Sequence, residues 1–437
     1  MMMTLLSLAL LPCAPQGGLT PHPGWPKSFS GQGFYSPANL ADLNSDGMVE
    51  MIVRSQDGGS GIIHLFHEDG SEQAGWPRDY GGNGFDGVTV AHLDPQGGAD
   101  LVFTTVWAGV FGGGSIEALD IQGRDVPGWP VNPHGRQSFI MPPVATGSAV
   151  ITSFIHYGNG LSRNYLVGLG PLGQPLALKE TQTAPSRGAA GDLDGDGQVE
   201  AVLVSGNLLM VMDGNGMKAG WPVQLREPIG KPSLGDFTGN GLREVVVPDA
   251  DGMHVFLLDG TELPGFPFLI GSAGTNLPFG QPALADLDQD GALEIVASGD
   301  NGELHAIEMG AAVPVEMPGF PVVIGGSLSD PVVGDVSGDG RPDVVLSTFH
   351  VGGSPELVAI DNLGNFTAGT PIAVQGNPGM AALGDIDGDN MTEVVLTTLG
   401  PIADFRGRLY VFDSPAVHDP NADWPLPQQD PARSSSR

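Results

Sequence analysis

The chain alternates short apolar runs with clusters of glycine, aspartate and proline. In residues 279–325, runs of four to six apolar or alternating residues begin near Phe279, Glu294, Glu303 and Gly319. Runs of this length, bounded by turn-forming residues, are strand signals. No segment holds a 3.6-residue apolar period long enough for a helix. The pattern predicts an all-β chain whose 68 glycines and 38 prolines lie in turns between strands.

The fourth run carries its own marker in five of the units, glycine followed by tryptophan or phenylalanine and then proline. We predict that the marker lies on an outer edge strand, because proline cannot donate to a ladder. The aromatic side chain of each marker can then pack between neighbouring units. The alternative interpretation is that the aromatic side chains form a platform for binding carbohydrate. The copies are Gly75-Trp76-Pro77, Gly128-Trp129-Pro130, Gly220-Trp221-Pro222, Gly265-Phe266-Pro267 and Gly319-Phe320-Pro321.

The two ends of the chain are out of phase with this unit. The chain starts with an orphan copy of the marker, Gly24-Trp25-Pro26, and its last unit has three strands, ending at Phe412, with no clear fourth. An N-terminal strand that completes the last sheet would close a ring. Four-stranded units repeated radially form a β-propeller, and a period near 50 residues suits one. We predict eight blades, with seven as the alternative if the third unit is not a true blade.

A nine-residue acidic pattern, D-x-[DN]-x-D-G-x-x-[DE], precedes the second strand in six of the units. Carboxylates at positions 1, 3, 5 and 9, with a sharp backbone turn at position 6, form an oxygen cage for a hard cation. In the last copy Asn390 takes the glycine position, and asparagine tolerates a positive φ well. The predicted side-chain ligands are Asp42, Asn44, Asp46, Glu50, Asp192, Asp194, Asp196, Glu200, Asp236, Thr238, Asn240, Glu244, Asp286, Asp288, Asp290, Glu294, Asp335, Ser337, Asp339, Asp343, Asp385, Asp387, Asp389 and Glu393.

Two further units have lost the pattern. The unit after the first copy has His92, Asp94, Gln96, Gly97 and Asp100 at the key positions, and we expect it to bind no metal. The following unit, at residues 141–152, has no acidic residue at all in the corresponding place. Counting both, the chain contains eight units.

The acidic loops and the strands around them resemble the FG-GAP/VCBS repeats of integrin-α-like β-propellers, as in residues 191–204. The resemblance spans residues 24 to about 416. It implies about six Ca²⁺ sites, with the main-chain carbonyl of position 7 as a further ligand. Thr238 and Ser337 at position 3 should weaken their two sites. The implied position-7 residues are Met48, Gln198, Leu242, Ala292, Arg341 and Met391.

Two other interpretations of the acidic loops are weaker. An EF-hand begins in the same way but needs a glutamate at position 12 and flanking helices. Here position 12 is apolar, as at Leu203, Val247 and Ala297, and strand formers surround the loops. Solvated acidic turns are the second alternative, but six such turns would not share one nine-residue pattern by chance.

The composition restricts the partners. The formal net charge is −33, and even six bound Ca²⁺ would leave the chain strongly acidic. This excess of negative charge argues against nucleic acid or an anionic membrane as a partner. The uniform repeat favours one large ring, and we expect a monomer.

The termini suggest export. Residues 1–18 have the apolar core of a signal peptide without a basic n-region, and Pro12 before Cys13 does not fit a lipoprotein signal. Residues 19–416 form the predicted propeller, and residues 417–437 a polar tail in which Trp424 could dock on the ring. No later stretch is long enough to span a bilayer. We expect a secreted, periplasmic or cell-surface protein, where calcium is abundant.

Catalytic motifs do not stand out. His64, His254 and His305 share one third-strand position, which marks them as part of the repeat. The chain has no nucleophile elbow, no His-Glu-x-x-His motif and no phosphate-cradling loop. The third unit, with His156 inside it and Trp107 before it, departs most from the repeat.

Two functions therefore compete. The first is a non-catalytic protein that binds an extracellular protein or polysaccharide, in adhesion or glycan recognition. The second is a calcium-dependent polysaccharide-degrading enzyme of the lyase type. With only 17 Lys and Arg residues to line a catalytic funnel, we favour binding.

Overall fold

The computed structural model covers the whole chain and describes most of it. The described residues are 17–29, 33–34, 36–44, 46, 48–57, 60–80, 87–93, 98–106, 113–132, 137–146, 149–158, 161–181, 185–213, 216–228, 230–270, 278–350, 353–400, 406–422, 424 and 426. Several predicted features lie outside this set: residues 1–16 of the signal-peptide-like segment, Trp107, residues 94–97 of the loop that has lost the acidic pattern, and residues 427–437 at the end of the tail.

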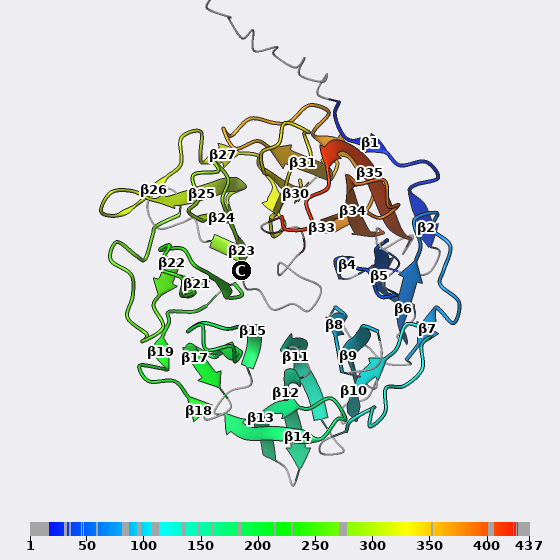
Figure 1. Cartoon of the computed structure of the whole chain (residues 1–437), viewed down its shortest axis with the longest axis vertical. Coiled ribbons are helices and arrows are strands. Elements are labelled where there is room, and N and C mark those ends of the chain that lie inside the picture. Colours follow the sequence, from blue (N-terminus) through cyan, green and yellow to red (C-terminus); the bar gives the residue numbers. More distant parts are fainter. Residues whose placement is uncertain are drawn as a thin grey trace, which may run out of the picture.

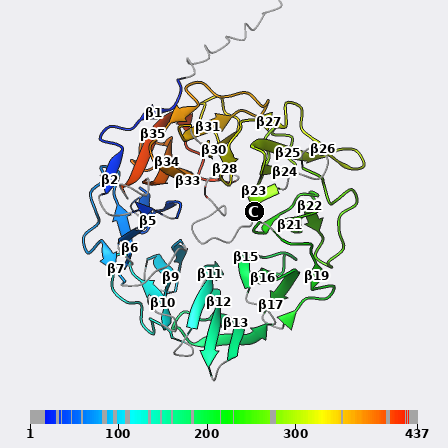
Figure 2. The ribbon, with the colours of Figure 1, turned by 180° about the vertical axis from the view of Figure 1, so that it is seen from behind.

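The described strands form eight antiparallel sheets arranged as blades around a central axis, in chain order (Figure 1 and, from behind, Figure 2). The prediction of an eight-bladed propeller is confirmed. In the first half of the ring, blade 1 contains β3 (Gly33–Phe34), β4 (Asn39–Ala41), β5 (Glu50–Asp57), β6 (Ser60–Phe66) and β7 (Arg78–Asp79); blade 2 contains β8 (Thr89–Ala91), β9 (Asp100–Val106) and β10 (Gly114–Leu119); blade 3 contains β11 (Gln137–Thr146), β12 (Ala149–Gly158), β13 (Leu161–Leu169) and β14 (Pro175–Thr181); and blade 4 contains β15 (Pro185–Gly191), β16 (Glu200–Ser205), β17 (Leu208–Asp213), β18 (Gly216–Met217) and β19 (Val223–Gln224).

The second half of the ring repeats this order. Blade 5 contains β20 (Ser233–Gly235), β21 (Glu244–Asp249) and β22 (Gly252–Phe256); blade 6 contains β23 (Pro278–Ala285), β24 (Glu294–Gly299), β25 (Glu303–Met309), β26 (Pro314–Glu316) and β27 (Val322–Val323); blade 7 contains β28 (Ser327–Leu328), β29 (Val332–Gly334), β30 (Asp343–Phe349), β31 (Glu356–Ile360) and β32 (Ile372–Ala373); and blade 8 contains β33 (Asn377–Gly384), β34 (Met391–Leu399) and β35 (Gly407–Val417), to which β1 (Thr20–Pro21) and β2 (Lys27–Phe29) are added.

The N-terminal segment closes the ring, as the phase shift predicted. β1 pairs with β35 through Thr20↔Asp413, and β2 pairs with the same strand through Lys27↔Leu409. The last three strands of the chain thus form one sheet with an outer strand that comes from the N-terminal segment. Blade 3 is a true blade of four strands, although its first hairpin joins Thr146 to Ala149 without the acidic loop.

Each sheet packs both of its faces against neighbouring blades. The second strands β16, β21 and β24 are buried at every residue, and after an initial glutamate each continues with at least three consecutive apolar residues instead of an alternating pattern. Near the axis, side-chain hydroxyl groups also bond to the backbone of the next blade. These bonds run from Thr89 Oγ1 to Pro143 O, 2.7 Å, Ser233 Oγ to Pro282 O, 2.6 Å, Ser347 Oγ to Gly379 O, 2.7 Å, and Thr397 Oγ1 to Ser36 O, 3.0 Å.

The aromatic markers lie between blades, and the prediction that their rings serve packing is confirmed. Trp76 and Trp221 are only 7% exposed, and Phe320 is 8% exposed. The prediction that the marker itself lies on the outer strand is wrong. In blade 6 it forms a turn that divides the outer strand into β26 and β27, because glycine at φ 97° and proline do not continue a ladder.

The beginning of the tail docks on the ring. Trp424 is 1% exposed, and its carbonyl accepts a hydrogen bond of 2.6 Å from Val333 N on β29. Leu426 is buried in the cluster that joins blades 1 and 8. Among the described residues, no helix is long and apolar enough to cross a membrane.

Candidate metal centres

The acidic loops connect the first strand of a blade to the second. In blade 6, Ala285 on β23 pairs with Glu294 on β24, so the pattern from Asp286 to Glu294 is the hairpin connection itself. The equivalent pair in blade 1 is Ala41 and Glu50, which closes the loop there in the same way. Because every first strand runs in the same direction along the axis, these loops all lie on one face of the ring.

The ninth residue anchors each loop. Its carboxylate is almost fully buried and accepts the backbone N–H of the second residue, whose apolar side chain is also buried. Asp100, in the copy that has lost the carboxylates of positions 1 and 5, accepts the same bond from Leu93 N at 2.8 Å. The anchor is therefore part of the fold, independent of a metal. The six other bonds are Leu43 N to Glu50, 2.9 Å, Leu193 N to Glu200, 2.9 Å, Phe237 N to Glu244, 2.8 Å, Leu287 N to Glu294, 2.7 Å, Val336 N to Asp343, 3.0 Å, and Ile386 N to Glu393, 2.9 Å.

The rest of the loop is shaped by hydrogen bonds from its own backbone. Position 1 accepts the N–H of position 6, as Asp192 does from Gly197 at 2.9 Å. Position 6 has a positive φ, 82° at Gly197 and 64° at Asn390, which confirms the expectation for Asn390. Position 4 also has a positive φ, including 63° at Gln289, and the sequence pattern did not reveal this requirement.

Position 7 is held by position 5. The N–H of Gln198 donates to Asp196 at 2.7 Å, and that of Ala292 donates to Asp290 at 2.8 Å. The corresponding bonds are made by Met48, Leu242, Arg341 and Met391. The role of the position-7 carbonyl as a ligand remains a prediction.

Among the described residues, three of the loops bring three carboxylates together. In each, one oxygen from every member lies within 4.8 Å of the others, a spacing at which a single cation could contact all three. All three copies have aspartate at position 3. The groups are Asp192, Asp194 and Glu200; Asp286, Asp288 and Asp290; and Asp385, Asp387 and Glu393.

In two of the other copies, a neutral side chain at position 3 donates to the buried ninth carboxylate instead. Asn44 Nδ2 donates to Glu50 at 2.7 Å, while Asn44 Oδ1 accepts from Asp46 N at 2.8 Å, which fixes the amide orientation. Thr238 Oγ1 donates to Glu244 at 2.9 Å. In blade 7, the backbone N–H of Ser337 donates to Asp343 at 2.8 Å. A neutral donor here satisfies the anchor but removes one carboxylate from the cage.

The charge of these loops is poorly compensated by the protein itself. Burial, together with the adjacent aspartates, raises the pKa of Glu294 and of Glu393 to about 8. Burial likewise raises the pKa of Asp343 to about 7, and also raises the pKa of Glu50 and of Glu244. An oxygen-only donor set of this kind fits a hard divalent cation, whose charge would favour the ionised forms.

One loop already has an internal cation. Lys218 Nζ lies 2.8 Å from Asp194 and 3.1 Å from Glu200, two of the three carboxylates that converge in blade 4. Its hydrogen bonds to Asp194 and Glu200 raise the pKa of Lys218, and those to Asp194 lower the pKa of that aspartate. The sequence pattern did not identify Lys218, which is 18 residues beyond the loop.

The three equivalent histidines belong to a separate structural link. His64, His254 and His305 each place Nδ1 next to a glutamate on the following hairpin segment, at 2.6, 2.6 and 2.5 Å from Glu72, Glu262 and Glu316. The glutamates lie 8 to 11 residues further along the chain. This pairing confirms that the histidines are part of the repeat.

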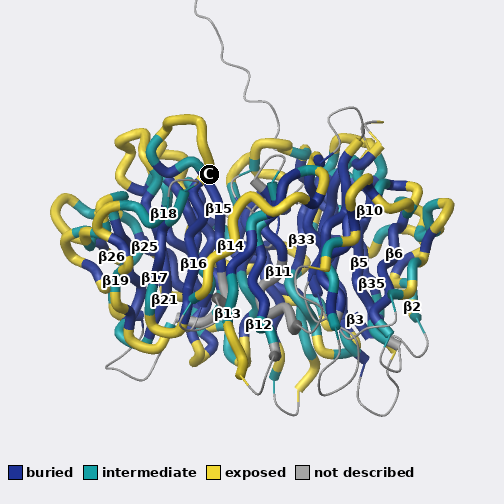
Figure 3. Tube along the Cα trace, turned by 90° about the horizontal axis from the view of Figure 1, so that it is seen from below, coloured by how far each residue is buried: buried dark blue, intermediate teal, exposed yellow. Residues whose placement is uncertain are grey.

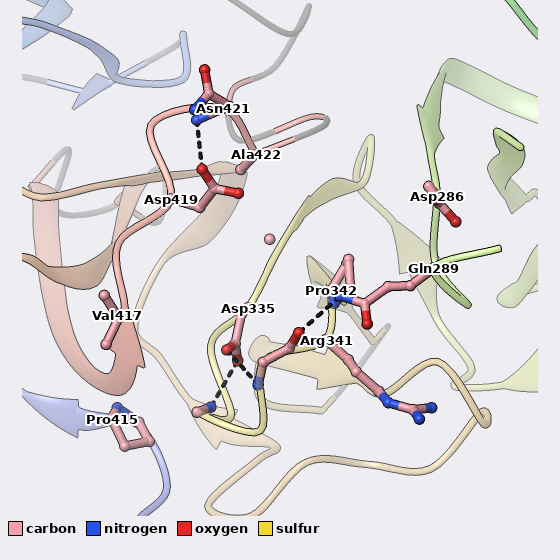
Figure 4. Close-up of a pocket in the computed structure, with 13 residues that line it drawn as sticks. Asp286, Gln289, Asp335, Arg341, Pro342, Pro415, Val417, Asp419, Asn421 and Ala422 are labelled. Atoms are coloured by element: carbon pink, nitrogen blue, oxygen red, sulfur yellow. Dashed lines mark hydrogen bonds between the residues drawn. The ribbon is translucent and has the colours of Figure 1, made fainter. Parts of the chain in front are cut away.

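The loops of blades 6 and 7 border a surface pocket of approximately 520 Å³ (Figure 4). Gln289 Nε2 donates to Gly340 O at 2.9 Å and so ties the two loops together. Asp335 lies between Asp286 and Gln289 on one side of the pocket and the end of β35 with the residues that follow it on the other, namely Pro415, Val417, Asp419 and Asn421. The pocket thus combines two acidic loops with the beginning of the C-terminal tail.

The fold and the loops define a class, the eight-bladed propeller with acidic hairpin loops. Residues 335–396, which include the last two of these loops, match a model of the FG-GAP-like repeat. The chain is thus a β-propeller with an FG-GAP-like repeat, as the resemblance in the sequence predicted.

One solved structure supports the fold. The Vibrio cholerae biofilm matrix protein Bap1 is similar, with a TM-score of 0.56 and 14% identity over 93% of this chain and 92% of that chain. Weaker likenesses are to Saccharomyces cerevisiae Sqt1, with a TM-score of 0.45, 10% identity, and 74% and 95% coverage, and to the lectin BP39L from Burkholderia pseudomallei, with a TM-score of 0.44, 15% identity, and 75% and 94% coverage. No curated protein sequence matches the chain.

Proposed function

We propose that this protein is a calcium-stabilised, non-catalytic propeller that binds a protein or polysaccharide outside the cell. The observation that carries the proposal is the repetition of one oxygen cage at equivalent hairpins, three times with converging carboxylates. A single acidic turn could be incidental. Repeated cages on a closed ring instead suit a cation that holds the hairpins in place.

The calcium would be structural. Extracellular modules bind calcium with Kd values of roughly 10⁻⁴–10⁻³ M. At about ten times Kd, one site adds roughly 1.4 kcal/mol to the free energy of unfolding. The three carboxylate clusters would together add about 4 kcal/mol, and all six loops about 8 kcal/mol, a large share of the stability of an ordinary domain.

The binding role rests on the face that these loops form. Rigid hairpins on one face of a ring offer a broad, preorganised surface, and loops on rigid scaffolds often carry binding residues. The similar fold of a biofilm matrix protein supports an extracellular role. The net charge of −33 favours neutral or cationic ligands over nucleic acid.

Two measurements test the proposal. Thermal unfolding with calcium and with excess EGTA should show a marked loss of Tm on chelation, and an identical melt would contradict the calcium role. A glycan array screened with and without calcium then tests binding. Ultraviolet detection of unsaturated products from any bound polysaccharide would overturn the non-catalytic assignment in favour of a lyase.

A further inference from the structure

The outer edge of blade 3 differs from the outer edges of the other blades. β14 is a continuous strand of seven residues, and all but its last residue are exposed. The outer strands described in the other blades are only two or three residues long, as in β7, β27 and β32. Figure 3 views the ring from this side and shows β14 along the surface in front of β12 and β13.

The difference has a cause in the sequence. In blades 1, 2, 4, 5 and 6 the glycine–aromatic–proline turn interrupts the outer strand, and such interruptions protect an edge from pairing with another chain. Blade 3 has no such turn between Leu169 and Thr181, so its outer strand continues unbroken. A long continuous edge is a template for strand addition.

The surface around this edge is apolar. Leu176 and Leu178 on β14 are 60% and 47% exposed, and Leu161 at the start of β13 is 64% exposed. Leu172, in the turn between the two strands, is 63% exposed. Leu176 and Leu178 are two residues apart and so share one face of β14, whereas Leu161 and Leu172 lie at opposite ends of the hairpin. Adjacent exposed leucines on an open edge are typical of an interaction surface.

Blade 3 is also the least acidic part of the ring. Residues 137–181 contain one acidic residue, Glu180, against Arg163 and Lys179, and Arg163 pairs with Glu180 at 3.2 Å. Blade 6, at residues 278–323, has eight acidic residues and no lysine or arginine. Two copies of this chain repel each other over most of their surfaces, and the repulsion is weakest where two blade 3 edges meet.

We propose that two copies of this chain associate through antiparallel pairing of their β14 edges. A two-fold axis through Leu178, the middle residue of β14, uses the whole strand and sets Pro175 opposite Thr181 of the second copy. Leu178 then faces its own symmetry mate, and Lys179 faces Ala177, so no like charges are opposed. The two blades become one eight-stranded sheet, and the monomer expected from the sequence becomes a dimer.

Sedimentation equilibrium of the full-length protein tests the association. The wild-type chain should show a concentration-dependent dimer. Leu178→Lys places two ammonium groups directly opposite each other on the axis and should weaken the dimer by about tenfold or more. The matched control is Val323→Lys, which changes a 70% exposed residue on the outer strand of blade 6 and should leave the dimer intact.

Disulfide crosslinking tests the register. In a Cys13→Ser background, Leu178→Cys brings two thiols together, because directly opposed residues have Cβ atoms about 4.5–5.5 Å apart. Glu180→Cys is the control, since the two introduced thiols would be displaced by four residues, about 13 Å along the strands. Crosslinking of the first variant and not of the second supports the two-fold axis at Leu178.

Three results would overturn the proposal. They are a wild-type protein that stays monomeric at every concentration, a dimer that Leu178→Lys does not weaken, and equal crosslinking of the two cysteine variants. Leu178 and Val323 are both exposed, so their substitution should leave the fold intact. Circular dichroism of each variant verifies that the propeller is folded.

Discussion

The indole N–H of Trp76 in blade 1 donates a hydrogen bond of 2.7 Å to the carbonyl of Ile121 in blade 2. The contact recurs around the ring, always from one blade to the next. Trp25 donates to Glu68 O at 2.9 Å, Trp129 to Pro171 O at 3.0 Å, and Trp221 to Leu258 O at 2.7 Å. The marker therefore joins consecutive blades by a bond as well as by packing.

Trp76→Phe should separate these two contributions. Phenylalanine already occupies the equivalent place at Phe266 and Phe320, so the ring can be accommodated. The substitution removes the donor and leaves the Ile121 carbonyl without it, at a cost of about 1–2 kcal/mol in the free energy of unfolding. Trp76→Ala also removes the packing and should cost about 3–5 kcal/mol.

Urea denaturation of the two variants and the wild type measures both costs. Equal stability of Trp76→Phe and the wild type would show that the hydrogen bond contributes nothing. If Trp76→Phe and Trp76→Ala lower the free energy of unfolding equally, the packing of the aromatic ring contributes nothing beyond the hydrogen bond.

The ring could be predicted because its signals are local and repeated. The acidic loops give the hairpin between first and second strands, and the orphan Trp25 strand predicts closure onto the last unit. The eighth blade required counting blade 3, which lacks the loop and retains only strand-length apolar runs. Local sequence thus predicted the repeat unit and favoured eight units over seven, and the eight sheets confirm that number.

The contacts between distant residues could not be predicted in this way. Lys218 follows its loop by 18 residues and meets Asp194 only because the third strand and the loop fold back on each other. Similarly, the continuous edge of β14 follows from the absence of a turn. An absent motif carries little signal until the neighbouring blades show what it does.

A single carboxylate should decide whether a loop binds calcium. Asp288 belongs to a converging group, whereas Thr238 is the equivalent position-3 residue in blade 5 and donates to Glu244. Asp288→Asn should lower the calcium stoichiometry by one and reduce the stability gained in calcium by about 1.4 kcal/mol. Thr238→Val should cost about 1 kcal/mol with or without calcium, because it removes a hydrogen bond.

Isothermal titration gives the stoichiometry, and melting curves with calcium and with EGTA give the stability. An Asp288→Asn protein that keeps the full stoichiometry would exclude this residue as a ligand. A calcium-dependent effect of Thr238→Val would instead support Thr238 as a ligand, as the sequence pattern predicted.

Lys218 should act as a substitute for a cation in blade 4. Without calcium, Lys218→Met leaves Asp194 and Glu200 without their ammonium partner and should cost about 1.5–3 kcal/mol. With calcium, the variant should bind the ion more tightly at this loop, since no internal cation competes. Lys27→Met is the control, because it removes the same charge from a lysine that lies over the Trp25 ring, 5.5 Å from its centroid, rather than between loop carboxylates.

Denaturation without calcium and calcium titration distinguish the possibilities. Unchanged affinity in Lys218→Met would show that the lysine does not occupy the position of the ion. Weaker binding would show that Lys218 orients the carboxylates rather than competing for them.

Two of the histidine links, those of His64 and His254, should respond to pH in opposite directions. His254 and His64 both contact a glutamate through Nδ1, but Nε2 of His254 lies 2.8 Å from Asp249, whereas Nε2 of His64 lies 2.8 Å from Ser55 Oγ. Asp249 and Ser55 occupy the same place on their strands, five residues after the buried loop anchor. The two environments thus differ mainly by one carboxylate.

The carboxylate of Asp249 reverses the direction in which the histidine pKa is shifted. Burial lowers the pKa of His64 from 6.5, and Glu72 does not offset the loss. Burial also acts to lower the pKa of His254, but Asp249 and Glu262 together outweigh it and raise the pKa above 6.5. The contribution of His254 to stability is therefore fully present below pH 6.5 and is lost as the pH rises through its folded pKa. The contribution of His64 is present above pH 6.5 and is lost as the pH falls.

Asp249→Ser converts the environment of His254 into that of His64. The substitution should lower the pKa of His254, so that the stability gained on acidification below neutral pH in the wild type becomes a loss. Nuclear magnetic resonance titration of the His254 ring gives the pKa directly, and urea denaturation between about pH 5.5 and 8 gives the stability. Ser55→Asp is the reciprocal variant and should raise the pKa of His64. If both rings titrate as in the wild type, the residue beside Nε2 does not set the charge of these links, and burial alone must account for the difference.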